Sequence, residues 1–276
     1  MSLVGRHLEL EALRACIAVG RHVLLEGPVG VGKTALARSV CAEAARGFVR
    51  VDGDGRYSEA RLVGQFDPPM VLQHGYRAES FMDGPLLRAM REGAVLFINE
   101  LNRMPEGVQN VLLPAMDEGM IVVPMLGEVR ASPGFGVIAT QNPGEFVATG
   151  ALSEALLDRF ELVRLDHAAE AEEREIVRLN CYGAPDAALI EGAVALVRAT
   201  RTDPRIRRGA SVRAAIAIAD LAAHLARTAE SLDDALFRAA ALALPHRIEL
   251  ADPHNVRLAT VLDDLRKKGT GARAGR

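Results

Sequence analysis

The chain has 276 residues and a formal net charge of −3, so it is long enough for one large domain or two smaller ones with a substantial core. Apolar residues make up 49% of the sequence, which excludes an intrinsically disordered chain. The slightly acidic balance gives no electrostatic reason to expect nucleic acid or an anionic membrane surface as partner.

Cysteine usage and hydropathy indicate the compartment. Cys16, Cys41 and Cys181 lie far apart and show no metal-ligand spacing, which is typical of reduced thiols. The first 20 residues contain acids and no continuous apolar core, so they do not resemble a signal peptide. No stretch approaches the roughly 18 apolar residues of a membrane span. We therefore expect a soluble cytoplasmic protein.

The first 166 residues show strands that alternate with helices. Apolar residues at helical spacing predict a helix over 7–18, and further helices are expected at 33–45, at 58–64 behind a Ser58 cap, and at 105–118. Short apolar runs predict five strands, at 22–27, 48–53, 94–99, 135–141 and 160–165. This alternation predicts an α/β domain with a parallel sheet between helices.

Two further segments indicate β-hairpins inserted into this domain. The first covers 68–85 and is predicted as strand, turn at His74 and Gly75, and strand; the second covers 120–134. Either could be an ordinary surface loop or could face a partner, in which case Gln73, His74 and Tyr76 would lie at the contact.

The predicted secondary structure changes near residue 166. Beyond it we expect only helices. The first begins at residue 167 with acidic residues, and Ala-rich helices follow over 187–199, 210–227, 231–244 and 253–267. The predicted domains are therefore 1–166, an α/β domain, and 167–268, a small all-helical domain. Residues 269–276 are expected to form a disordered tail.

The segment "GPVGVGKT", residues 27–34, predicts a phosphate-binding loop, because it follows a strand and precedes a helix. Glycines allow backbone N–H groups to converge on phosphate oxygens, and the following helix adds its N-terminal dipole. Lys33 is expected at the β- and γ-phosphates of ATP, and the Thr34 hydroxyl at Mg²⁺. The alternative is a glycine-rich turn. The predicted nucleotide-binding residues are Gly27, Pro28, Val29, Gly30, Val31, Gly32, Lys33, Thr34 and Ala35.

The strand at 94–99 ends in Asn99 and Glu100, where an ATP-hydrolysing protein usually has two acids. Glu100 is the expected base that polarises the attacking water. Asn99 is expected to contact Mg²⁺ through a bound water, using its carbonyl oxygen but bringing no charge. The alternative is that Asn99 only caps the strand and orders the loop.

The order of motifs resembles the MoxR family of AAA+ ATPases over most of the chain. The similar segments are "VGRHLELEALRACIAVGRHVLLEGPVGVGKTALA", "FMDGPLL", "NELNRMPEGVQNVLLPAMDEG", "FGVIATQNP", "LSEALLDRF" and "RRGASVRA". The resemblance implies a P-loop AAA+ core with a five-stranded parallel sheet, followed by a helical lid. Family members mostly have Asp where this chain has Asn99, which predicts a working but slow ATPase.

The resemblance also implies residue roles. Val4 and Gly5 would lie near the adenine, Asn142 would be sensor 1, Arg159 an arginine finger for the neighbouring subunit, and Arg213 sensor 2. From the residues alone, each of these three polar residues has an alternative. Asn142 before Pro143 is also a turn pair, Arg159 beside Asp158 a surface ion pair, and Arg213 a helix-start cation behind Ser211.

The same resemblance implies the partners. A finger supplied in trans requires a homo-oligomer, with a hexameric ring as the family expectation. The client or adaptor would be a protein, one with a von Willebrand factor A domain by analogy. The alternative function is an ATP-gated assembly module with little hydrolysis. A nucleic-acid motor is disfavoured by the net charge, and a small-molecule kinase would not need Arg159 or Arg213. Arg103 would contact nucleotide across the interface or stabilise its own loop.

Overall fold

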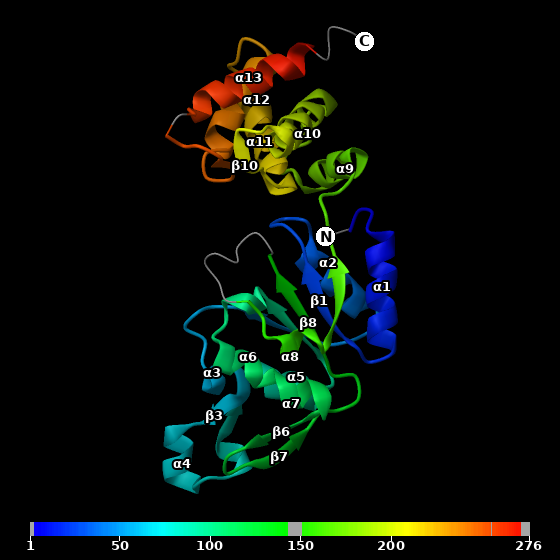
Figure 1. Cartoon of the computed structure of the whole chain (residues 1–276), viewed down its shortest axis with the longest axis vertical. Helices are drawn as coiled ribbons and strands as arrows, with labels where there is room; N and C mark the ends of the chain where they lie inside the picture. Colours follow the sequence, from blue (N-terminus) through cyan, green and yellow to red (C-terminus); the bar gives the residue numbers. More distant parts are fainter. Residues whose placement is uncertain (1–2, 143–150, 255, 272–276) are drawn as a thin grey trace. The chain divides into compact units, whose positions relative to one another are not determined.

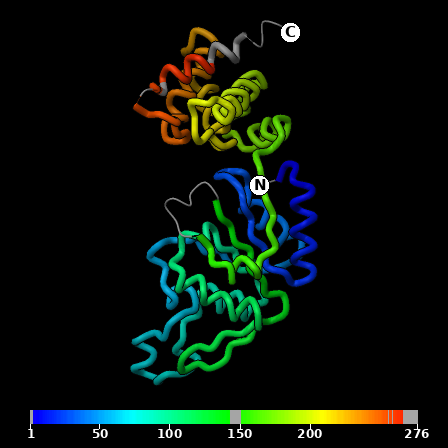
Figure 2. Tube along the Cα trace, in the orientation of Figure 1, coloured from blue at the N-terminus to red at the C-terminus, as the bar shows by residue number. Residues whose placement is uncertain are grey.

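A computed structural model describes residues 3–142, 151–254 and 256–271. The chain forms two compact units. The first comprises Arg6–Pro28 and Gly32–Asp166, and the second contains His167 onward together with Val29–Val31. Figures 1 and 2 trace the sheet and its helices in blue to green and the later helices in yellow to red. Each unit has its own buried core.

The first unit is built on the predicted five-stranded parallel sheet. In chain order its strands are β1 (His22–Glu26), β2 (Phe48–Asp52), β5 (Val95–Asn99), β8 (Gly136–Gln141) and β9 (Phe160–Arg164). Their order across the sheet is β2-β5-β8-β1-β9, with every neighbouring pair parallel. The predicted sheet is thus confirmed. Because β5 is buried at four consecutive positions, both faces of the sheet must be covered.

Helices supply that cover. The helices of the first unit are α1 (His7–Ala18), α2 (Lys33–Glu43), α3 (Glu59–Val63), α4 (Pro68–His74), α5 (Pro85–Glu92), α6 (Glu106–Asn110), α7 (Leu112–Asp117) and α8 (Glu154–Leu157). The connection through α2 runs from β1 outward to β2, whereas that through α5 returns from β2 to β5. Since parallel crossovers are right-handed, α2 and α5 lie on opposite faces.

The predicted helix over 105–118 is interrupted. It forms α6 and α7, with Val111 between them. Pro114 lies in the first turn of α7 and has no N–H to donate, so a continuous helix would leave the carbonyl of Asn110 without its usual partner. The sequence pattern identified the buried positions, of which Val108, Leu112 and Ala115 are in the core. It did not identify the break.

The predicted hairpin over 68–85 is wrong in its strands, because residues 68–74 form α4. Pro68 and Pro69 occupy the first turn, where proline suits a helix, and Gly75 ends it with φ 74°. No residue of α4 is buried, so its apolar side chains do not repeat at the helical period that would have predicted a helix. A short antiparallel pair does exist at the base of the insert, formed by β3 (Gly64–Phe66) and β4 (Phe81–Asp83).

The second predicted hairpin is confirmed. β6 (Met120–Val123) and β7 (Gly127–Arg130) pair antiparallel. The two inserts lie at the same end of the first unit (Figure 1). A cavity of about 460 Å³ is lined by Phe66 and Phe81 from the first insert and by Val123 and Pro124 from the second. The inserts therefore form one continuous surface.

The second unit is mainly helical, as predicted. Its helices are α9 (Glu170–Asn180), α10 (Ala187–Thr202), α11 (Val212–Leu225), α12 (Leu232–Ala243) and α13 (Leu258–Gly271). The prediction missed a two-stranded ribbon of β10 (Ile206–Arg208) and β11 (Glu249–Leu250). In the expected tail, residues 269–271 are the end of α13, and 272–276 lie outside the described residues.

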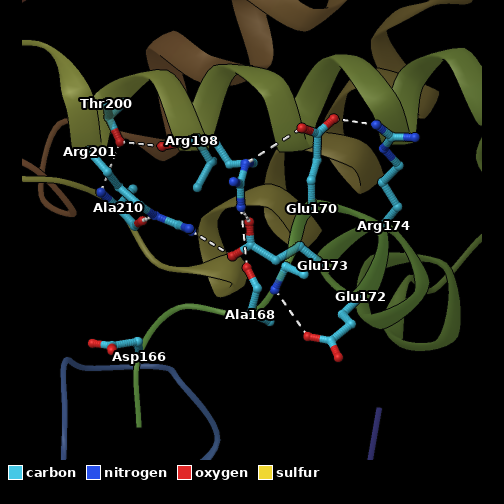
Figure 3. Close-up of polar contacts among 12 residues, drawn as sticks. Asp166, Ala168, Glu170, Glu172, Glu173, Arg174, Arg198, Thr200, Arg201 and Ala210 are labelled. Atoms are coloured by element: carbon cyan, nitrogen blue, oxygen red, sulfur yellow. Dashed lines mark hydrogen bonds and ion pairs between the residues drawn. The ribbon is translucent and has the colours of Figure 1, made fainter. Parts of the chain in front are cut away.

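A buried carboxylate joins α9 to α10 in this unit. The carboxylate of Glu173, only 1% exposed, lies 2.8 Å from Arg201 Nη2 and 3.1 Å from Arg198 Nη1 (Figure 3). Arg201 Nε also donates to the carbonyl oxygen of Ala210 at 2.8 Å. Because a charge buried this deeply is costly unless it is paired, the cluster fixes how the two helices pack.

Candidate nucleotide site

Residues 27–34 connect the carboxyl end of β1 to the first turn of α2 (Figure 1). Gly30 and Gly32 have φ 82° and 100°, values that suit glycine. Gly27 is required for a different reason, since a β-carbon there would lie 2.1 Å from the carbonyl oxygen of Leu165. The glycines therefore give the loop a backbone path that larger residues would strain.

Lys33 is the first residue of α2 and turns its side chain back over the loop. Its Nζ donates to the carbonyl oxygens of Gly27, at 2.5 Å, and Pro28, at 2.9 Å. Thr34 and Ala35 follow in the first helical turn and are half-buried. The N-cap of this 11-residue helix is Gly32, which provides no side-chain cap. The arrangement places an ammonium group and a helix N-terminus around one loop.

Glu100 follows β5 with a left-handed backbone, φ 58° and ψ 53°. Its N–H donates to Thr140 Oγ1 of β8 at 2.8 Å, and its carboxylate lies 3.0 Å from Arg103 Nε. A left-handed glutamate costs roughly 1–2 kcal/mol and persists only when its surroundings hold it there. Arg103 thus contacts its own loop, and its contact with nucleotide across an interface stays a prediction.

The Asn99 side chain is held on both sides. Its Oδ1 accepts from Thr140 Oγ1 at 3.1 Å, and its Nδ2 donates to Asp52 Oδ1 at 3.0 Å. Sequence reasoning missed Asp52 and Thr140. A signal was present for Asp52, because an acid that ends one parallel strand lies at the same sheet edge as the residue that ends its neighbour.

Asp52 is an ionised partner for Asn99. Arg50 Nη2 lies 2.7 Å from Asp52 Oδ1. This guanidinium, followed by the Asn99 amide, holds the pKa of Asp52 below its usual value. Position 99 lacks the acid that the family resemblance predicts, and an acid, Asp52, ends the neighbouring strand β2.

The structure places the remaining predicted residues separately. Asn142 directly follows β8 and is buried, whereas Pro143 belongs to 143–150, outside the described residues. Arg159 lies between α8 and β9, and its Nε and Nη2 donate to the two carboxylate oxygens of Asp117 at 2.6 and 2.5 Å. The expected ion pair of Arg159 therefore exists, but with Asp117 rather than with Asp158.

Three predicted residues belong to the second unit. Arg213 lies exposed in the first turn of α11. Val4 is half-buried, and Gly5 has φ 67°, where a β-carbon would lie 2.0 Å from Glu172 Oε1. Their contribution to nucleotide binding stays a prediction.

The donor set fits a nucleotide with Mg²⁺. The Thr34 hydroxyl, the Asn99 carbonyl oxygen and the Glu100 carboxylate are hard oxygen donors of the kind that Mg²⁺ prefers. Within the described residues, no group of three or more His, Cys, Asp or Glu side chains is arranged to hold a metal ion alone.

The fold and the loop together define the class of P-loop nucleotide-binding proteins with a parallel sheet and a helical second unit. Residues 22–160 match the AAA domain family (dynein-related subfamily), and the chain belongs to this family as a MoxR-type AAA+ ATPase. No helix in the described part of the chain is both long and apolar enough to span a membrane.

Named relatives agree with this assignment. The chain is 35% identical to the gas vesicle ATPase GvpN of Haloferax mediterranei, over 61% of this chain and 53% of that protein. It is 33% identical to GvpN1 of Halobacterium salinarum, over 79% of this chain and 65% of that protein. The chain thus spans between half and two thirds of these relatives. Its fold resembles that of NtrX from Brucella abortus in complex with ADP (TM-score 0.59, 19% identity, 98% of this chain and 62% of that chain).

Proposed function

We propose that this chain hydrolyses ATP at the carboxyl ends of β1, β5 and β8. The observation that carries the proposal is Glu100, which is held in a costly left-handed conformation beside the phosphate loop's sheet edge. Backbone N–H groups of residues 29–34 and the Lys33 ammonium would bind the phosphates. Glu100 would orient the attacking water and accept its proton.

Bound Mg²⁺ would neutralise charge on the phosphates, with the Thr34 hydroxyl as its protein ligand and Asn99 as a contact through water. The Glu100–Arg103 ion pair at 3.0 Å must loosen or be shared for Glu100 to act as a base. Since Asn99 brings no charge, we expect turnover slower than that of relatives with Asp at this position.

Assembly would complete the site. Arg159 would act as an arginine finger on the nucleotide of the neighbouring subunit. Asn142 would contact the γ-phosphate or the attacking water, and Arg213 would contact the γ-phosphate and so link it to the helical unit. A homo-oligomeric ring, hexameric by family expectation, follows from a finger in trans. In the isolated chain Arg159 is bonded to Asp117, so assembly would have to exchange that partner.

A protein client is the partner that the inserts fit best. Leu72 and Tyr76 of the α4 insert are 89% and 59% exposed, and Met125 of the β6–β7 hairpin is 71% exposed. Exposed apolar side chains are typical of protein contacts when they gather on one surface, and the two inserts lie at the same end of the first unit (Figure 1). A partner with a von Willebrand factor A domain remains the family expectation.

The second candidate is an ATP-gated assembly module in which hydrolysis is negligible. The amide at residue 99 favours it, because one negative charge near the metal is missing from β5. The two functions differ in turnover, not in binding.

Phosphate release separates them. The purified chain, Glu100→Gln and Asn99→Asp are compared with and without Mg²⁺, and ATP binding is measured for all three. We expect Mg²⁺-dependent turnover in the parent and almost none in Glu100→Gln, with ATP binding retained. A silent parent that binds ATP and assembles would favour the gated module.

A further inference from the structure

A hydrogen-bond chain crosses the carboxyl ends of three neighbouring strands. Asp52 ends β2 and is in register with Asn99, which ends β5, and Thr140 lies in the adjacent β8. Asn99 Nδ2 donates to Asp52 Oδ1 at 3.0 Å, and Thr140 Oγ1 donates to Asn99 Oδ1 at 3.1 Å. The N–H of Glu100 donates to Thr140 Oγ1 at 2.8 Å. The chain thus runs from an exposed carboxylate to the backbone of the proposed base.

Each donor and acceptor in this chain is determined by its neighbour. An ionised carboxylate can only accept, so the amide nitrogen of Asn99 faces Asp52 and its carbonyl oxygen faces Thr140. The single hydroxyl proton of Thr140 is then used toward Asn99, which leaves its oxygen to accept from Glu100. Linked hydrogen bonds of this kind reinforce one another.

An aspartate at position 99 would break the chain at its first step. Two carboxylates would then face each other at about 3 Å beside the Arg50 guanidinium on Asp52, and their repulsion would raise the pKa of one of them. Asp52 and Asn99 are therefore chemically matched, with one negative charge and one amide. The charge is on β2 instead of β5.

We propose that Asp52 is a positioning residue of the hydrolytic site. It orients the Asn99 amide, acts through Thr140 on the backbone of Glu100, and supplies the negative charge that position 99 lacks. This inference rests on the proposed ATP hydrolysis. The Asp52 side chain is 59% exposed, so water screens its charge and its effect depends on orientation as much as on Coulomb attraction.

The test exchanges the two groups. The variants are Asp52→Asn, Asn99→Asp, the double exchange, and Asp54→Asn as control. Asp54 is a nearby exposed acid whose carboxylate accepts from the N–H of Arg56 at 2.8 Å. One readout is the Mg²⁺ concentration for half-maximal phosphate release. The other is the melting temperature without nucleotide or Mg²⁺, between pH 5 and pH 8.

Each single exchange should raise the Mg²⁺ requirement about tenfold, the lower end of the range for residues that orient metal contacts. Asn99→Asp should also lose melting temperature as pH rises, because a carboxyl whose folded-state pKa is raised destabilises the fold above its unfolded pKa. The double exchange should recover most of both losses, and Asp54→Asn should match the parent.

Additive losses in the double exchange would overturn the proposal, as would faster turnover in Asn99→Asp with Asp52→Asn unchanged. If the parent releases no phosphate, the proposed function fails, and the melting temperatures still decide on the pair. A pH-dependent loss of melting temperature in Asn99→Asp that is absent from the double exchange supports the Asp52–Asn99 pairing. If Asn99→Asp shows no such loss, the pairing is rejected.

Discussion

At the scale of single residues, the backbone of Glu100 carries the clearest physical signature of function. Its φ of 58° is costly for any residue with a β-carbon, and the contacts from Thr140 and Arg103 compensate for that cost. A residue chosen for stability alone would be glycine here. We infer that the carboxylate is retained for chemistry.

Replacement of Glu100 tests this strain directly. Glu100→Gly should exceed Glu100→Ala in free energy of unfolding by roughly 1 kcal/mol, since glycine removes the left-handed strain and loses somewhat more backbone entropy. Chemical denaturation measures the difference. At Glu191, an exposed position inside α10, the same two substitutions should rank in the opposite order. If Ala is at least as stable as Gly at position 100, the strain is absent.

The Arg159–Asp117 pair predicts a pH dependence. The bidentate guanidinium holds the pKa of Asp117 below its ordinary value, which is about 3.9 in unfolded chains. A depressed carboxyl pKa stabilises the fold above the unfolded value, and the contribution is lost as pH falls through the folded value. Asp117→Asn should therefore melt below the parent at pH 7, and the difference should shrink as the pH falls below about 3.9, the unfolded value. If Asp158→Asn lowers the melting temperature at pH 7 by the same amount, the Arg159–Asp117 pair is not the source of the loss.

At the scale of elements, strand prediction succeeded where burial is two-sided. The apolar runs at 22–27, 94–99 and 135–141 form β1, β5 and β8, because a central parallel strand needs apolar residues on both faces. Prediction failed over 68–85, where the exposed α4 has no buried face to give its helical period. The turn residues there were identified, but the conformation between them was not.

The phosphate loop was predictable because its chemistry is local in sequence. The Asp52–Asn99–Thr140 chain was not, because it depends on which strands become neighbours and in what register. The Arg159–Asp117 pair was missed for the same reason, since 42 residues separate its members. Contacts across the sheet edge need the folded topology.

The packing of α9 on α10 gives a prediction at this scale. Glu173→Gln removes the charge that compensates Arg201 in a buried position (Figure 3), and we expect a loss of about 2 kcal/mol in the free energy of unfolding. Glu175→Gln on the same helix breaks an exposed pair with Arg178 and should change it by less than about 0.5 kcal/mol. Equal effects of the two substitutions would contradict a structural role for Glu173.

At the scale of the whole molecule, the family assignment accounts for a feature that one chain leaves unexplained. Arg159 directly precedes β9, at the amino end of the parallel sheet, whereas the phosphate loop follows the carboxyl end of the neighbouring β1. The proposed finger therefore lies at the opposite edge of the sheet from the phosphate loop of its own chain. A ring resolves this, because each subunit would offer Arg159 to its neighbour. Hydrolysis would then depend on assembly, and assembly would present the two inserts together to a client.

The measurement that tests this account most directly is phosphate release from mixed subunits. Lys33→Ala is expected to abolish the chain's own phosphate site and Arg159→Ala to remove the proposed finger, so each variant alone should be almost inactive. In the mixture, some sites would pair an intact Lys33 with an intact Arg159 from the next subunit. We therefore predict that Mg²⁺-dependent phosphate release returns in part. If the mixture stays as inactive as its components while the parent hydrolyses ATP under the same conditions, Arg159 does not act in trans and the proposed assembly is wrong.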